Sequence, residues 1–127
     1  MNESTVAAAV KDAGQKNWTR FFYAAAIFNF LIGLVAMLVP ESTPDGRIIG
    51  VLVFSFGVIY LLVARNPVGF AATLWAGVIG KLGVVGLLGP RTFFEGGEPV
   101  MMVVLGLDLF FALGFLVYLF GREDAAD

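Results

Sequence analysis

Two ionisable residues, Lys81 and Asp108, stand inside stretches of the sequence that otherwise have the composition of membrane-spanning helices. Asp108 lies within the apolar residues 100–120, and Lys81 lies within residues 68–88. A charged side chain at the centre of a membrane helix costs roughly 2.5–3.5 kcal/mol on insertion scales. Such a group is therefore paired, faces a water-filled cavity, or takes part in function. Lys81 and Asp108 are accordingly the first candidates for chemistry in this chain.

The residues missing from the sequence limit what that chemistry is. The chain contains no Cys and no His. This excludes disulfides, thiolate chemistry and the usual zinc, haem and iron–sulfur sites, and it removes the commonest general base. A single intramembrane carboxylate without such partners is a poor catalytic set. We therefore expect no enzymatic activity and no cofactor, and an intramembrane enzyme acting on lipid is the least favoured function.

The composition indicates a membrane protein. Of the 127 residues, 59% are hydrophobic and 14% are charged, whereas soluble domains have about 45–50% and about 25%. The formal net charge is -2 and there is no basic patch, which argues against binding to nucleic acid. A chain of this length favours one domain, so we expect a single membrane domain over residues 1–127.

Four apolar runs predict four membrane-spanning helices, at about residues 21–39, 48–64, 68–88 and 100–120. The nineteen residues of the first run rise about 28 Å as a helix, which is enough to cross the hydrocarbon core. The short connection Arg65-Asn66-Pro67 forces the second and third spans into an antiparallel hairpin. The predicted fold class is all-α, an integral membrane antiparallel four-helix bundle.

The distribution of Lys and Arg predicts the orientation of these spans. One side of the predicted bundle carries Lys11, Lys16, Arg20, Arg65 and Arg122, and the other side carries Arg47 and Arg91. Because cytoplasmic loops are enriched in positive charge, both termini are expected in the cytoplasm. Residues 6–10 form either a short interfacial helix or a frayed leader, residues 89–99 form a loop, and residues 121–127 form a polar tail.

A polar layer is predicted at one depth of the membrane. Lys81 lies seven residues before position 88, and Asp108 lies eight residues after position 100. Both are therefore about 10–12 Å below the outer boundary on consecutive antiparallel helices, where they can meet. Ser55 on the second span falls in the same layer, and Asn29 on the first span is slightly deeper. Lys81, Asp108, Asn29 and Ser55 form the candidate intramembrane polar site.

Three interpretations of this layer remain open. In the first, Lys81 and Asp108 form a buried ion pair, braced by Asn29 and Ser55, that fixes the register of the helices. In the second, Lys81 extends its long stem to the outer interface, and Asp108 is protonated or faces water. In the third, the pair lines a polar cavity that binds a ligand headgroup or relays a proton.

These interpretations lead to two classes of function. The first fits a non-enzymatic accessory or interaction subunit, bound to a protein partner or to further copies of itself within the lipid bilayer. The third fits a small ligand-binding or transport protein that uses the Lys/Asp pair.

The third span contains a second notable feature, a glycine at every third position. The series is Gly77, Gly80, Gly83, Gly86 and Gly89. Glycines remove side chains from a helix and permit close approach of another backbone, so we expect tight helix packing along this span. The alternative is that the gaps admit a lipid tail or a ligand. Gly33, Gly50, Gly57, Gly106 and Gly114 offer further close-packing positions.

Much of the chain resembles small bacterial inner-membrane proteins with four spans and no established activity. The residues that carry the resemblance are Asn29, Gly33, Asn66, Pro67, the GVIGKL segment of residues 77–82, and Asp108. In those proteins the acid follows Asn and precedes Trp and Pro, whereas in this chain it stands in the segment GLDLFF, residues 106–111. The resemblance implies a four-span fold and a location in the bacterial inner (plasma) membrane. It implies no substrate.

Overall fold

The computed structural model describes residues 2–122, and within that range every regular element is helical. Four helical segments there are long and apolar enough to cross a membrane. They are Glu3–Leu38, Pro44–Arg65, Pro67–Phe94 and Pro99–Gly121. The predicted all-α fold class with four membrane-length helices is therefore confirmed. The described chain divides between Phe70 and Ala71 into two compact units, and each unit is a helical hairpin.

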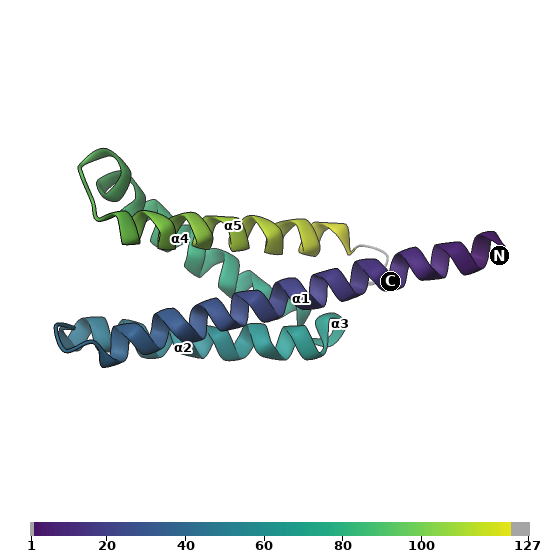
Figure 1. Ribbon diagram of the computed structural model, residues 1–127, viewed down its shortest axis with the longest axis horizontal. Coiled ribbons are helices and arrows are strands. Elements are labelled where there is room, and N and C mark those ends of the chain that lie inside the picture. The colour runs from purple at the N-terminus through teal and green to yellow at the C-terminus, as the bar shows by residue number, and fades with distance from the viewer. Residues whose placement is uncertain (1, 123–127) are drawn as a thin grey trace. The chain divides into compact units, whose positions relative to one another are not determined.

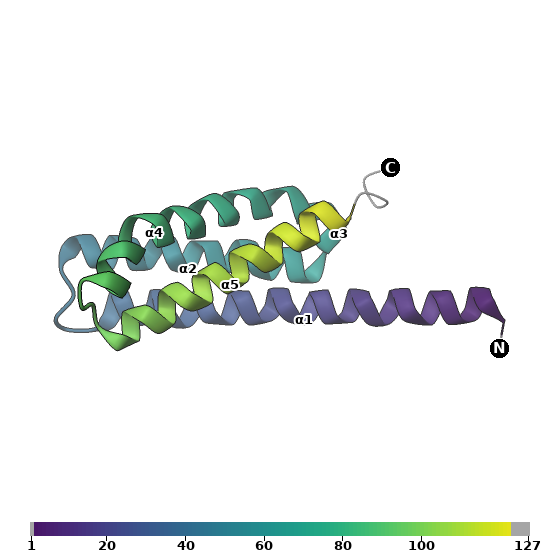
Figure 2. The same ribbon diagram turned by 90° about the horizontal axis from the view of Figure 1, so that it is seen from above.

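The first hairpin consists of α1 (Glu3–Leu38) and α2 (Pro44–Arg65), which lie side by side (Figures 1 and 2). Residues 6–10 are helical, because α1 is one continuous helix from Glu3, so the frayed leader is wrong of the two alternatives for this segment. Asn2 starts α1 by accepting a hydrogen bond from the amide of Thr5 at 2.9 Å. No proline follows until residue 40, so nothing in the sequence interrupts the helix.

Glycines hold α1 and α2 in close contact. A Cβ atom placed on Gly33 would lie 2.7 Å from the carbonyl oxygen of Gly50 and 2.7 Å from the amide nitrogen of Phe54. A Cβ atom on Gly50 would lie 2.8 Å from the carbonyl oxygen of Gly33. Gly57, seven residues further along α2, receives the ring of Phe30 in the same way, at 2.8 Å. The close-packing role predicted for Gly33, Gly50 and Gly57 is confirmed: a larger residue at Gly33 or Gly50 would separate the two backbones, and one at Gly57 would displace the Phe30 ring.

The connection between α1 and α2 is closed by side chains that satisfy the helix ends. The guanidinium group of Arg47 donates to the carbonyl oxygens of Met37 and Val39, the second at 3.3 Å. These carbonyls have no partner within the helix itself, because they belong to its last turn. Thr43 caps α2 by accepting a hydrogen bond from the amide of Gly46 at 3.0 Å. Side-chain hydrogen bonds therefore hold both the end of α1 and the start of α2 at this turn.

The third span begins in one unit and ends in the other. Asn66 accepts a hydrogen bond from the amide of Gly69 at 3.0 Å and so caps the short helix α3 (Pro67–Phe70), as Asn66-Pro67 predicts. A 3₁₀ turn, η1 (Ala71–Thr73), then leads into α4 (Leu74–Phe94).

The second hairpin pairs α4 with α5 (Pro99–Gly121). The predicted loop at residues 89–99 was too long, because α4 continues through Pro90 and ends at Phe94. The turn that remains uses Gly96 in the left-handed conformation, at φ 77°, which glycine adopts without steric cost. At the opposite end of the hairpin, the rings of Trp75 and Phe120 meet edge to face at 5.8 Å. The predicted polar tail at 121–127 lies outside the described residues from position 123 onward.

The glycine series of the third span does not act uniformly. Gly77 and Gly89 are buried. Among the described residues, however, no atom lies within 4 Å of a Cβ placed on Gly83 or Gly86, and the same holds for Gly106. The step of three residues drifts around a helix with 3.6 residues per turn, so the series cannot face one neighbour. The tight packing expected of this series is therefore wrong for Gly83 and Gly86, as it is for Gly106.

We predict that Gly50→Ala destabilises the first hairpin by about 1–3 kcal/mol, because the new methyl group must displace the backbone of α1. Unfolding in detergent micelles would measure this. Gly14→Ala is the matched control in α1, since a Cβ there meets no atom within 4 Å and alanine raises helix propensity by up to about 1 kcal/mol. Equal stability of the two variants would contradict the close contact.

Candidate intramembrane polar site

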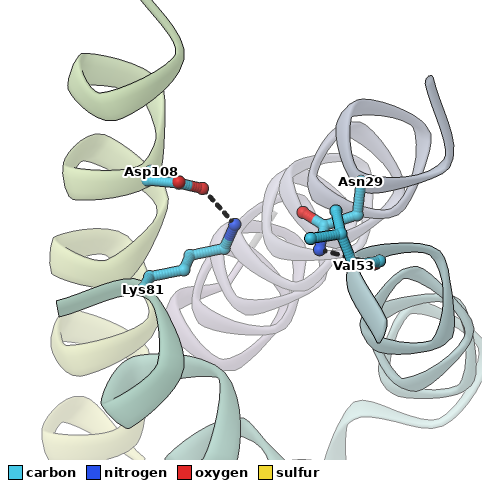
Figure 3. A network of polar contacts seen from close by, with 4 residues as sticks. All are labelled: Asn29, Val53, Lys81 and Asp108. Atoms are coloured by element: carbon cyan, nitrogen blue, oxygen red, sulfur yellow. Dashed lines mark hydrogen bonds and ion pairs between the residues drawn. The ribbon is translucent and has the colours of Figure 1, made fainter. Parts of the chain in front are cut away.

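The structure brings Lys81 and Asp108 together. Lys81 Nζ, from α4, donates a hydrogen bond to Asp108 Oδ1, from α5, at 2.7 Å (Figure 3). The side chain of Lys81 is 6% exposed and that of Asp108 is 15% exposed. The two groups therefore form a direct ion pair shielded from the surroundings.

The antiparallel hairpin explains why these two residues meet. The turn after α4 is short, so α5 must return along α4. Residues placed well before the turn then lie beside residues placed well after it. The contact between Trp75 and Phe120 continues the same pairing further from the turn. The expectation that Lys81 and Asp108 lie at similar depth and can meet is confirmed, and of the three open interpretations the structure shows the ion pair, although α4 extends beyond the predicted end.

Phe111 completes the surroundings of the ammonium group. Lys81 Nζ lies 5.8 Å from the centroid of the Phe111 ring, within the range of a cation–π interaction. Phe111 follows Asp108 by three residues, so both side chains lie on the same face of α5. Its ring is stacked with Phe115 at 6.5 Å. This contact was not predicted from the sequence, although the three-residue spacing of Asp108 and Phe111 indicates it.

This geometry supports the first interpretation, the buried ion pair, and excludes the second, in which Lys81 extends to the outer interface. Lys81 is buried and bonded to Asp108, so the interpretation in which its stem extends to the outer interface is wrong. Asp108 likewise has a cationic partner within hydrogen-bond distance. Because a lone charge is costly in a membrane, each residue lowers the free-energy cost of burying the other there.

Asn29 and Ser55 belong to the first hairpin, and each has a backbone partner there. Asn29 Nδ2, on α1, donates to the carbonyl oxygen of Val53, on α2, at 3.0 Å (Figure 3). Asn29 is 4% exposed. Ser55 is exposed, and its hydroxyl donates to the carbonyl oxygen of Val51 in the preceding turn of its own helix at 2.8 Å. That these two residues share one site with Lys81 and Asp108 stays a prediction.

The buried polar side chains of the described residues are satisfied internally. In residues 2–122 no buried side-chain nitrogen or oxygen is without a hydrogen-bond partner. Over the same range, no three acidic, His or Cys side chains gather where they could hold a metal ion. What the arrangement does directly is to join α4 to α5 by a charged contact and α1 to α2 by an amide contact.

Comparisons of the chain with protein-family models, with curated proteins and with solved structures found no match. The resemblance to bacterial four-span proteins therefore stays a prediction. The helices themselves define the class: this is a small multi-pass membrane protein with a buried Lys81–Asp108 ion pair.

We predict that Lys81→Met and Asp108→Asn each destabilise the protein by on the order of 3 kcal/mol, because each leaves one buried group without its partner. The double variant should lose much less than the sum of the two. Unfolding free energies of the four proteins of this cycle, measured in the same detergent, give the coupling. Additive effects would show that the pair contributes no interaction energy.

We also predict that Asn29→Leu weakens the first hairpin by about 0.6 kcal/mol, the average for interhelical polar contacts in membranes. Ser55→Ala should leave stability nearly unchanged, since its hydroxyl bonds within one helix turn. Both variants remove one polar group, so comparing their unfolding separates a contact between helices from a local one. A larger loss in Ser55→Ala would overturn this distinction.

Proposed function

We propose that this protein is a non-enzymatic accessory or interaction subunit of the bacterial inner membrane, built as a single membrane domain. The observation that carries the proposal is the direct Lys81–Asp108 contact, at 2.7 Å between Nζ and Oδ1. Two charges that neutralise each other define helix geometry. A ligand that used either charge would first have to displace its partner.

The distribution of mass supports the same role. Within residues 2–122, the segments between the membrane-length helices are short, and the longest extension is the polar start of α1. Such a chain offers its helix faces and one helical extension for contact, and little else. A protein partner or a further copy of the chain, within the lipid bilayer, is the kind of ligand these surfaces suit.

The positive residues support an orientation with both termini in the cytoplasm. Lys11, Lys16 and Arg20 stand on the polar start of α1, and Arg65 ends α2. Arg47, on the opposite side, is bound to the carbonyl groups at the end of α1 and so has a local structural role. The excess of positive charge therefore belongs to the side we assign to the cytoplasm.

The alternative, a small ligand-binding or transport protein, would use the same two residues. A ligand there must compete with an ion pair that already satisfies both partners, and with the Phe111 ring beside Lys81. The alternative predicts that Asp108→Asn abolishes binding of a small molecule even while the protein remains folded.

The test is native mass spectrometry of the tagged protein, extracted gently from its own membrane. We expect a protein subunit at fixed stoichiometry, retained in the Lys81→Met/Asp108→Asn double variant, because the neutral pair preserves packing. That variant is the matched control for charge. A stoichiometric lipid or small molecule in place of a protein, lost in Asp108→Asn, would contradict the accessory role and establish the alternative.

A further inference from the structure

One face of α1 carries a regular series of exposed residues from end to end. Their positions alternate in steps of four and three: Val6, Val10, Ala13, Asn17, Arg20, Ala24, Ile27, Leu31, Leu34 and Leu38. All ten are exposed and eight are apolar. This spacing is the heptad pattern that packs one helix along another, and in α1 it continues over more than four heptads. We refer to these ten residues as the α1 heptad face.

The α1 heptad face is distinct from the contact with α2. The buried residues of α1 include Phe22, Ala26, Asn29 and Gly33, which follow the same steps of four and three. The two series are offset by two residues, or about 200° around the helix. They therefore lie on opposite sides of α1, so the hairpin partner leaves the heptad face uncovered.

Part of this face lies where no lipid can cover it. The 36 residues of α1 span about 54 Å, and the hydrocarbon core of a membrane is about 30 Å thick. The start of α1 extends past the end of α2 (Figure 1), and its polar sequence places it outside that core. Val6 and Val10 are 45% and 67% exposed there, which exposes apolar surface to water.

The opposite side of the same segment has the character of a surface that stays in water. Lys11 and Gln15 lie there, each two residues from Ala13 of the heptad face. Lys16 and Asp12, which form an ion pair one turn apart at 3.4 Å with side chains 67% and 63% exposed, lie between the two sides and flank the heptad face. The extension therefore carries Val6, Val10 and Ala13 on its heptad side and Lys11 and Gln15 on the other, with exposed alanines at positions 7–9 around the helix.

We propose that the α1 heptad face is a self-association surface, on which two copies of this chain pack α1 against α1 in parallel. The helices must be parallel because both copies cross the membrane in the same direction, which places a two-fold axis along α1. Asn17 occupies a core position of the heptad, where a single Asn fixes register and favours two strands. Arg20, the next core position, has a stem long enough to carry its charge outward to the lipid headgroups.

The heptad spacing indicates which surface covers the α1 heptad face. A bilayer covers only the spanning part, whereas the heptad runs without a shift from the membrane into water. A second α1 is the surface that carries the same repeat at the same heights. The α1 heptad face is separate from the Lys81–Asp108 pair, and a second copy of the chain packed on it is the partner of the proposed interaction role.

The chain has no Cys, so single-cysteine variants test this directly. In a parallel two-fold pair each core residue faces its own copy, within the Cα–Cα range of about 4.4–6.8 Å that a disulfide requires. In oxidised membrane vesicles we expect Val6→Cys, Val10→Cys and Ala13→Cys to form dimers several-fold faster than the controls. The matched controls on the opposite side are Ala8→Cys, Lys11→Cys and Gln15→Cys. Equal rates around the helix, or no dimers at the core positions, would overturn the proposal.

A second measurement does not depend on cysteine chemistry. Two copies of the chain with different tags are expressed together, and one tag is used to purify both. We expect Ala13→Glu to abolish co-purification, because it places two carboxylates against each other in the core, while Ala8→Glu leaves it unchanged. Both variants are exposed positions of one helix and carry the same charge. Co-purification that survives Ala13→Glu would overturn the proposal.

Discussion

The contact between Lys81 and Asp108 is the interaction on which the second hairpin depends. A lone charge within the hydrocarbon core costs several kcal/mol, so a helix carrying Lys81 or Asp108 is tolerated only with a partner at the correct depth. This condition fixes both the distance of each residue from the turn and the side of each helix that faces the other. The Phe111 ring, 5.8 Å from Lys81 Nζ, adds an apolar wall with a weak attraction for the same cation.

The first hairpin solves the packing problem by different means. It has no charge in its seam, and its helices approach through Gly33 and Gly50 until backbone meets backbone, while Gly57 makes room for the Phe30 ring. One amide, from Asn29 to the carbonyl of Val53, crosses this seam. Dispersion forces between close backbones are weak singly and large in sum. One hairpin is therefore specified by electrostatics and the other by shape, and both are joined through the short helix α3.

Hydropathy predicted four helices, and depth counted along the apolar runs predicted that Lys81 and Asp108 could meet, with the ion pair as one of three interpretations. Both predictions follow from the thickness of the membrane, which is a constraint external to the chain. Local features escaped prediction for the opposite reason. Pro90 lies inside α4, whereas a proline in a sequence ordinarily indicates the end of a helix. Ser55 was assigned by its height alone, and height does not reveal that a hydroxyl bonds within its own helix turn.

The measurement that tests the central claim most directly is the distance between the two charged groups in a lipid bilayer. Replacing Lys11 and Lys16 by Arg leaves Lys81 as the single lysine of the chain. Solid-state NMR can then detect dipolar coupling between ¹⁵N-labelled Lys Nζ and ¹³C-labelled Asp Cγ. The structure predicts strong coupling, since Nζ and Oδ1 are 2.7 Å apart, and its loss in Asp108→Asn. Absence of coupling in the parent protein would contradict the ion pair, and with it the electrostatic basis of the second hairpin.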